Sequence, residues 1–120
     1  MPDVRRLFGN RGEDRAAAFL KALGYKILAR QFNTRFGEID LIAQDGDEIV
    51  FVEVKARRSV DFGYPEESVT KKKLEKIERV GEWYLKQRNL EYAPFRIDVI
   101  AIEDDLLQPK IHHIKAVGES

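Results

Sequence analysis

The sequence predicts an α/β fold with the element order α-β-β-β-α-β-β, in which helices pack on a mixed central sheet. Two segments show the apolar spacing of helices, and five others read as strands, several of them rich in β-branched and aromatic residues. An Asp-Gly pair between the second and third strands is typical of an antiparallel hairpin. A helix separates the third and fourth strands, which therefore can run parallel, and a mixed sheet covered by helices is the natural result.

The first half of the chain is predicted to form a helix and three strands. Small and apolar residues recur at helical spacing over residues 12–24, and Gly24 is a good helix terminator. The strands are predicted at residues 25–32, 36–43 and 47–56. The segment QDGD supplies the tight turn between the second and third of these strands.

The second half is predicted to add one helix and two strands. Residues 57–68 read as a loop, which contains Gly63 and Tyr64. The helix is predicted to begin between Pro65 and Thr70 and to end near Arg88. The last two strands are predicted at residues 93–102 and 110–117.

Length and composition favour one soluble domain. The 120 residues fit a single domain over 1–120, with its core at about 12–117. The chain contains no cysteine, so it has neither disulfides nor thiolate metal ligands. It also contains no apolar run of membrane-spanning length and no segment typical of a secretory signal. These features predict a cytoplasmic protein that does not bind membranes.

The charges are unevenly distributed although the formal net charge is zero. Residues 36–53 carry six acidic and no basic side chains, whereas residues 1–35 have a net charge of +5 and residues 54–79 of +3. A nucleic-acid backbone would favour the basic segments, and a divalent cation would favour the acidic centre. The alternative is mixed surface charge that serves solubility alone.

Carboxylates interrupt the two strands of the predicted hairpin. Because side chains alternate along a strand, Glu53 and Lys55 share one face of the third strand, and Glu38 and Asp40 share a face of the second. A two-residue loop at Asp45-Gly46 would place residue 38 opposite residue 53, and a loop at Gly46-Asp47 would place residue 40 there. Both registers bring all four side chains to one face.

Glu13 is predicted to join this cluster. It lies on the apolar side of the first helix, and a place in the first turn would suit the helix dipole. Carboxylates on one face repel each other, so they need a positive partner, either Lys55 or a divalent cation. Oxygen ligands suit Mg²⁺ or Mn²⁺, and such an ion with a nearby lysine can promote phosphodiester hydrolysis. Basic side chains near the cluster are then predicted to hold the nucleic-acid backbone: Lys55, Arg57, Arg58, Lys71, Lys72 and Lys73.

Asp40 followed by Glu53-Val54-Lys55 on the next strand resembles the motif of the PD-(D/E)xK nucleases, the restriction-endonuclease-like superfamily. GEIDLIA followed by FVEVKAR resembles the YraN-like family of small bacterial proteins, which are related to archaeal Holliday junction resolvases. The similarity extends from about Gly12 to Val117. Ile39 stands where the name-giving motif has proline, a difference that is common among the resolvase-like members.

The resemblance implies a restriction-endonuclease-like core and a nuclease activity on DNA, with branched or flap structures as the preferred substrate. Asp40 and Glu53 would bind the metal with the backbone carbonyl of Val54, Glu13 would assist, and Lys55 would be the catalytic lysine. Water would attack the phosphorus directly, without a covalent enzyme intermediate. Resolvases act as dimers, which raises the expectation of a homodimer. The alternative is a nucleic-acid-binding or accessory protein that retains the fold without turnover.

Other polar residues leave alternatives open. Glu38 either lines the site or pairs with Arg35 or Arg57, and Asp98 either supports the site or is a structural partner of an arginine. Lys71 to Lys73 either contact phosphates or form a solvated helix start. The remaining expectations concern two neighbouring pairs. His112 and His113 point to opposite faces of a strand as packed or surface residues, and Trp83 and Tyr84 fit helix packing better than base stacking.

Overall fold

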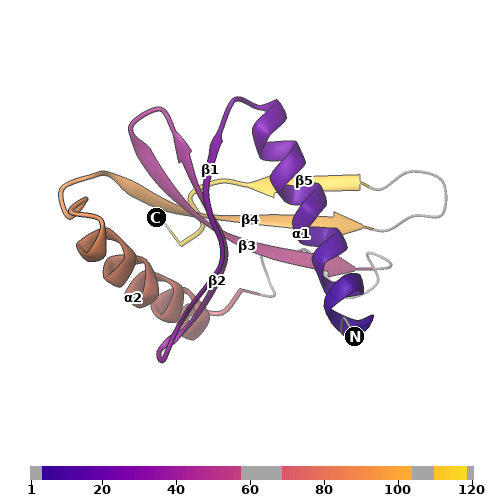
Figure 1. The fold of residues 1–120 in the computed structure, drawn as a ribbon, viewed down its shortest axis with the longest axis horizontal. Coiled ribbons are helices and arrows are strands. Elements are labelled where there is room, and N and C mark those ends of the chain that lie inside the picture. Colours follow the sequence, from indigo (N-terminus) through magenta and orange to yellow (C-terminus); the bar gives the residue numbers. More distant parts are fainter. Residues whose placement is uncertain (1–3, 58–68, 104–109, 119–120) are drawn as a thin grey trace.

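A computed structural model describes residues 4–57, 69–103 and 110–118. Its elements follow the predicted order (Figure 1). They are α1 (Val4–Ala22), β1 (Lys26–Thr34), β2 (Gly37–Asp45), β3 (Glu48–Arg57), α2 (Lys71–Gln87), β4 (Phe95–Glu103) and β5 (Lys110–Ile114). The predicted α/β class and the predicted element order are therefore confirmed.

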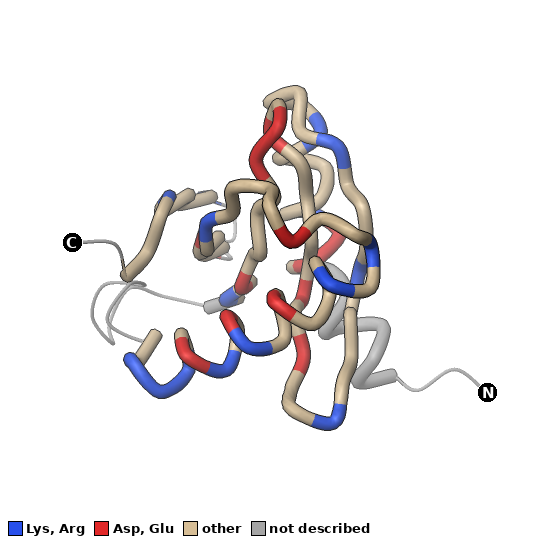
Figure 2. Tube along the Cα trace, turned by 90° about the vertical axis from the view of Figure 1, so that its left-hand side faces the viewer, with Lys and Arg blue, Asp and Glu red and all other residues tan. Residues whose placement is uncertain are grey.

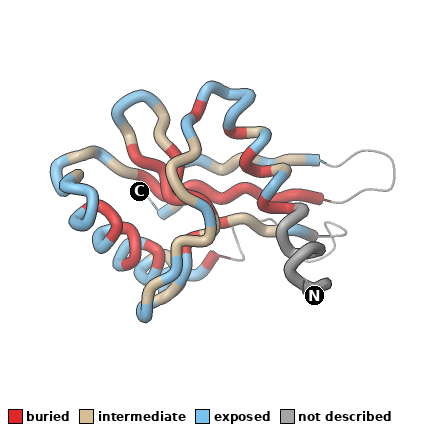
Figure 3. Tube along the Cα trace, in the orientation of Figure 1, coloured by how far each residue is buried: buried red, intermediate tan, exposed pale blue. Residues whose placement is uncertain are grey.

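The five strands form one sheet in the order β1-β2-β3-β4-β5. β3 and β4 are parallel, and the other neighbouring pairs are antiparallel, as the hairpin and the intervening helix predicted. The central strands β3 and β4 are buried along most of their described length, as Figure 3 shows. A parallel pair at the centre needs cover on both faces, and the two helices supply it.

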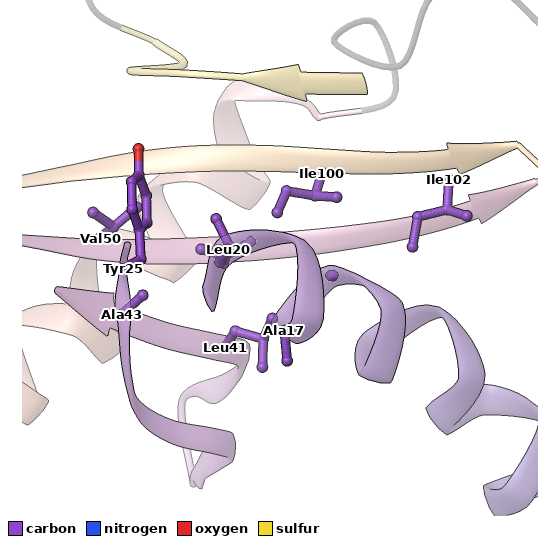
Figure 4. Packing of buried hydrophobic residues seen from close by; sticks show 10 residues of the cluster. Ala17, Leu20, Tyr25, Leu41, Ala43, Val50, Ile100 and Ile102 are labelled. Carbon is purple, nitrogen blue, oxygen red and sulfur yellow. The ribbon is translucent and has the colours of Figure 1, made fainter. Parts of the chain in front are cut away.

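The two helices pack on opposite faces of the sheet. Val50 and Val52 belong to a cluster with α1, whereas Ile49 and Phe51 belong to a cluster with α2. Because successive strand residues point to opposite faces, these clusters lie on the two sides of the sheet. Figure 4 shows the α1 cluster, where Leu20 and its neighbours on the helix meet the buried strand residues.

α1 begins at Val4, so the predicted start at residue 12 was wrong. Glycine lowers helix propensity, which made the segment before residue 12 look unlike a helix. At Gly12 the reason for glycine is tertiary, because an added Cβ would lie 3.2 Å from the Cβ of Ala56 on β3. The small residue lets the helix approach the sheet closely.

α2 begins at Lys71, one residue after the predicted range for its start, and ends at Gln87, next to the predicted Arg88. Thr70 is its N-cap, and its hydroxyl accepts a hydrogen bond of 3.1 Å from the backbone N–H of Lys73. The helix buries Tyr84, whose ring packs edge-on against Phe32 and Phe51. Trp83, by contrast, is 46% exposed, so the predicted helix packing was wrong for this residue.

At Gly81, α2 lies close to the sheet. A Cβ at this position would lie 2.5 Å from the buried ring of Phe51. We expect Gly81→Ala to lower the free energy of unfolding by about 1–3 kcal/mol, as overpacking does in a dense core. Urea denaturation measures the loss, and adding Phe51→Leu should recover part of it. An unchanged midpoint for Gly81→Ala would contradict this packing.

The strand ends differ from the predicted ones by at most three residues, and β5 starts at Lys110 as predicted. β5 ends at Ile114 rather than at residue 117 because Ala116 has a φ of +54°, which is incompatible with a continuous strand. The chain turns there, and the backbone N–H of Val117 donates to the carbonyl of Ile97 on β4. Neither helix of the described chain combines the length and the apolar character needed to cross a bilayer.

Candidate active site

The hairpin register places Asp40 beside Glu53. Asp45 pairs with Glu48, so the two-residue loop is Gly46-Asp47, the second of the two predicted registers. Gly46 has a φ of +63°, which favours glycine at this turn position. The paired residues continue as far as Leu41 and Val52, immediately before Asp40 and Glu53.

Asp40 lies where the ladder of β2 and β3 ends. Its Oδ2 atom accepts a hydrogen bond of 2.8 Å from the backbone N–H of Val54. The side chain thus takes the place of a backbone acceptor and holds its carboxylate against β3. Among the described residues, Val54 is the only donor to this carboxylate.

Glu53 is enclosed by two lysines. Its carboxylate is only 9% exposed, and its Oε1 atom lies 3.5 Å from Lys55 Nζ and 2.6 Å from Lys73 Nζ. Lys55 is two residues along the same strand, whereas Lys73 reaches the site from the first turn of α2. The adjacent Lys73 side chain, followed by partial burial, lowers the pKa of Lys55.

Glu13 is buried in the middle of α1 and reaches β1. Arg30 Nε donates to its Oε1 atom over 2.8 Å, and Gln31 Nε2 donates to its Oε2 atom over 3.2 Å. Arg30 also pairs with Asp14 on the next position of the helix. The prediction of an inward-facing Glu13 is confirmed, but its place in the first turn was wrong, because α1 starts nine residues earlier. A guanidinium, rather than the helix dipole, balances its charge.

Negative charge surrounds Asp40. Burial, followed by the nearby carboxylates of Glu53, Glu38 and Glu13, raises the pKa of Asp40 to about 6, although the hydrogen bond from Val54 opposes the shift. The three other predicted carboxylates therefore all act on Asp40. Such a concentration of oxygen ligands and negative charge is favourable for a divalent cation.

This raised pKa predicts how stability changes with pH. A carboxyl group whose pKa is higher in the folded state is most favourable to folding below its unfolded value of 3.8, and that contribution is lost as the pH rises through about 6. Asp40→Asn keeps an acceptor for Val54 but removes the charge. We expect this variant to be more stable than the original protein by about 1–2 kcal/mol at pH 7, after allowance for solvent screening, and equally stable near pH 4.

Urea denaturation in EDTA at several pH values measures this difference. EDTA keeps divalent cations from binding to Asp40 and masking its electrostatic cost. Asp47→Asn at the exposed turn is the matched control, and it should show no such pH dependence. If the free energies of unfolding of Asp40→Asn and the original protein differ by the same amount at pH 4 and at pH 7, charge repulsion at Asp40 is contradicted.

The donor set is suited to Mg²⁺ or Mn²⁺. Among the described residues, no three Asp, Glu, His or Cys side chains are arranged to hold an ion. Mg²⁺ is commonly bound by one or two carboxylates and completes its shell with water. Asp40 and Glu53, with the carbonyl of Val54, are the groups that could hold such an ion, and Lys73 would then have to release Glu53.

The other predicted side chains are only partly brought to the site. Glu38 is exposed and close enough to influence Asp40, and no described residue forms an ion pair with it. Of the predicted phosphate-binding residues, Lys73 contacts the site, and Lys71 and Lys72 are exposed. Arg57 ends β3, but its side chain lies outside the described residues, as do Arg58, Gly63 and Tyr64.

Asp98 belongs to a separate buried network on the α1 side of the sheet. It is fully buried and accepts hydrogen bonds from Arg96 Nε and the backbone N–H of Ala116, each over 3.0 Å. His113 Nε2 lies 2.7 Å from its second oxygen, and Tyr25 completes the network through Arg96. Of the two alternatives for Asp98, the structural partnership with an arginine is the observed one.

The two histidines lie on opposite sides of β5, as predicted. The side chain of His113 is 8% exposed and packs edge-on against Phe19 and Tyr25. His112 is exposed and lies 3.4 Å from Glu103. The pair therefore does not converge on one ligand.

Arg30 and Gln31 are site residues that the sequence interpretation missed. They interrupt the apolar pattern of β1, which was the one available signal. Gln31 has a φ of +50°, an uncommon conformation for a residue other than glycine. Such strain is often found at functional sites, and here it accompanies the hydrogen bond to Glu13.

Comparison with known proteins identifies close relatives. The model of a family described as "Uncharacterised protein family UPF0102" matches residues 12–102. A UPF0102 protein of Caldicellulosiruptor saccharolyticus is 45% identical over 82% of this chain and 83% of its own. A UPF0102 protein of Clostridioides difficile is 46% identical over 88% and 91%, and one of Pseudarthrobacter chlorophenolicus is 43% identical over 97% and 89%. None of these names states an activity.

Proposed function

The chain belongs to the UPF0102 family, the YraN-like family of the sequence prediction, and from the geometry of its site we propose that it is a metal-dependent nuclease. One observation carries the proposal. The carboxylate of Asp40 accepts a hydrogen bond from the backbone N–H of Val54, next to Glu53, and Glu53 forms an ion pair with Lys55. These residues meet at the end of a hairpin in a mixed sheet. The restriction-endonuclease-like assignment of the core is part of the same proposal.

The proposed roles follow from the positions of the side chains. Asp40, Glu53 and the carbonyl of Val54 would hold Mg²⁺ or Mn²⁺, and Glu13 would support the site from α1 through its negative charge. A bound divalent cation supplies polarisation of a phosphate oxygen and acidifies a coordinated water. Lys55 would orient the attacking water or stabilise the charge that develops on the phosphate oxygens.

Lys73 would have two partners in turn. Its ammonium neutralises Glu53 in the present structure, and a divalent cation would compete for the same carboxylate. Once released, the ammonium would lie at the N-terminus of α2, within reach of a substrate phosphate. Lys71 and Lys72 would add to the positive charge there, in agreement with the predicted backbone contacts.

The substrate proposed is DNA, with branched or flap structures preferred because of the resemblance to resolvases. A homodimer belongs to the same proposal, since a junction presents two symmetric cuts. The alternative is an accessory protein that binds nucleic acid without cleaving it. The observation that favours this alternative is the neutralisation of Glu53 by two lysines, which can stabilise the site without any metal.

The decisive experiment combines cleavage and metal binding. Purified protein is incubated with labelled branched, single-stranded and duplex DNA in Mn²⁺, and with EDTA as the control. We expect cleavage only with Mn²⁺, together with a rise in melting temperature that corresponds to about 2.7 kcal/mol at a hundredfold excess over Kd. Binding of the same DNA without cleavage, and without any metal-dependent shift, would favour the accessory protein.

A further inference from the structure

We infer that the exposed side of α2 binds a single-stranded nucleic-acid segment and leads it to the carboxylate–lysine site. The surface consists of Lys72, Lys76, Arg79 and Trp83 of α2, joined by Phe36 at the tip of the β1–β2 hairpin; we name it the basic–aromatic face. This inference rests on the proposed function for its destination, and it names the class of substrate. The surface itself is described by contacts, exposure and charge.

Helical spacing places the four α2 residues in one row. They recur at intervals of four, three and four, so they lie on one side of the helix. The row extends about 16 Å along the axis. All four side chains are exposed, and no described carboxylate forms an ion pair with Lys72, Lys76 or Arg79. Their charges therefore remain available to an anionic partner.

The acidic residues of α2 lie in a row next to the basic one. Glu75, Glu78 and Glu82 recur at intervals of three and four, and this row is separate from the basic one. Figure 2 marks the charged positions along the helix and on the neighbouring strands. Glu75 stands three residues after Lys72 and four before Arg79, yet no ion pair joins it to either of them within the described residues. The cations of the basic row are therefore left to a negatively charged partner.

A shallow hollow lies at the start of the basic–aromatic face. It has a volume of about 300 Å³ and is lined by Thr70, Lys72, Lys73 and Lys76. The N-terminus of α2 opens into the same region, where the helix dipole favours negative charge. Lys73 connects the hollow to the candidate active site, since its ammonium lies 2.6 Å from Glu53. A phosphate bound in the hollow would therefore lie next to the proposed reaction centre.

Aromatic rings interleave with these cations. Trp83 is 46% exposed and Phe36 is 39% exposed, values that are high for large apolar side chains. The Arg79 guanidinium lies 5.9 Å from the centre of the Phe36 ring, and the Arg35 guanidinium lies 5.0 Å from it. These cation–π contacts hold Arg79 in place, which reduces the entropy cost of binding a phosphate or a base.

The combination favours a single strand over a duplex. The bases of a duplex are stacked on each other, whereas those of a single strand are free to stack on exposed aromatic rings and guanidinium groups. Cations alone would bind the backbone of either form. Trp83 and Phe36 are therefore the residues that identify the partner, and a flap or an unpaired arm of a branched DNA would supply such a segment.

Trp83 makes a direct test possible because it is the only tryptophan in the chain. Oligothymidylate of about 16 nucleotides, a length within known site sizes, is titrated into the metal-free protein in EDTA. We expect quenching of tryptophan emission that saturates with the same Kd as the fluorescence anisotropy of the labelled oligonucleotide. A matched duplex should bind more weakly and leave the emission unchanged.

Variants separate stacking from charge. Trp83→Ala should weaken oligothymidylate binding about tenfold and duplex binding by less than twofold. The pair Lys76→Glu and Arg79→Glu should weaken both and reduce the salt dependence by about two units of slope. Two controls remove comparable exposed side chains elsewhere, namely Tyr92→Ala and Lys110→Glu, and should bind as the original protein does. Melting curves verify that each variant is folded.

Several results would overturn the inference. They are unchanged tryptophan emission at saturating oligonucleotide, equal losses for Trp83→Ala and Tyr92→Ala, or tighter binding of the duplex than of the single strand. Binding to anionic vesicles in the absence of oligonucleotide binding would also overturn it. Because the titrations are performed in EDTA, a protein that binds the single strand but never cleaves DNA would leave this inference supported and would contradict the proposed nuclease function alone.

Discussion

Asp40→Ala is expected to abolish Mn²⁺-dependent cleavage while DNA binding survives. The substitution removes a carboxylate that the backbone N–H of Val54 holds next to Glu53, and with it one of the two proposed side-chain ligands for the cation. The remaining carboxylate would keep its two lysine partners and bind metal poorly. We also expect the metal-dependent rise in melting temperature to disappear in this variant, because ligand linkage depends on the intact site.

Lys55→Ala tests the other half of the site and has a different signature. It should lower the cleavage rate about 10²–10³-fold, the usual cost of losing one group that stabilises developing charge. Metal-dependent stabilisation should remain, since Asp40 and Glu53 are retained. Single-turnover cleavage measures the rate, and anisotropy measures DNA binding.

The matched controls for these two variants are Asp47→Ala at the exposed hairpin turn and Lys26→Ala at the exposed start of β1. Both should cleave as the original protein does. Cleavage that persists in Asp40→Ala would show that a contaminating nuclease or a different site is responsible. Loss of metal-dependent stabilisation in Lys55→Ala would remove the proposed division of roles.

The second large effect concerns stability and the buried network of Asp98. Asp98→Ala should lower the free energy of unfolding by about 2–4 kcal/mol, because His113 and the backbone N–H of Ala116 would lose their buried acceptor, while Arg96 would keep Asp45 and Glu48. A loss of that size is a large part of the stability of a small domain. Although burial opposes ionisation, His113, the backbone N–H of Ala116 and Arg96 together lower the pKa of Asp98.

The sign of this shift predicts the pH dependence. A carboxylate with a lowered pKa in the folded state stabilises the protein above its unfolded pKa of 3.8, and it loses that contribution as the pH falls through the folded pKa. The free energy of unfolding of the original protein should therefore exceed that of Asp98→Ala by the largest amount at pH 7, and this difference should decrease at acidic pH. Urea denaturation measures it, with Asp47→Ala as the control. A loss below about 1 kcal/mol at pH 7 would show that the network contributes little.

The local signals predicted the order of the elements, and tertiary contacts determined the exceptions. Apolar spacing and the Asp-Gly turn were sufficient to predict the order of the seven elements, the one parallel strand pair and the hairpin. The start of α1 was missed because Gly12 is favoured by its closeness to Ala56, a contact between distant parts of the chain. Trp83 was misplaced because the helix pattern alone does not show how far the sheet extends beneath each side of α2.

The candidate site shows the same division. The alternation of side chains along β2 and β3 was enough to predict that Asp40, Glu53 and Lys55 share one face, since a two-residue loop left only two possible registers. No local pattern indicated that Lys73 would reach Glu53 or that Arg30 would balance Glu13. These contacts join residues at least 17 positions apart, and their formation depends on how both helices pack.

The sequence by itself determined the element order, the shared face of the carboxylates and the membership of a family. It could do so because strand alternation, turn chemistry and helical spacing are local properties of the chain. Only the tertiary structure decided which cations neutralise these carboxylates and which aromatic side chains remain exposed. The physical reason is that an ion pair between distant residues, and the burial of a ring, depend on the packing of elements against each other.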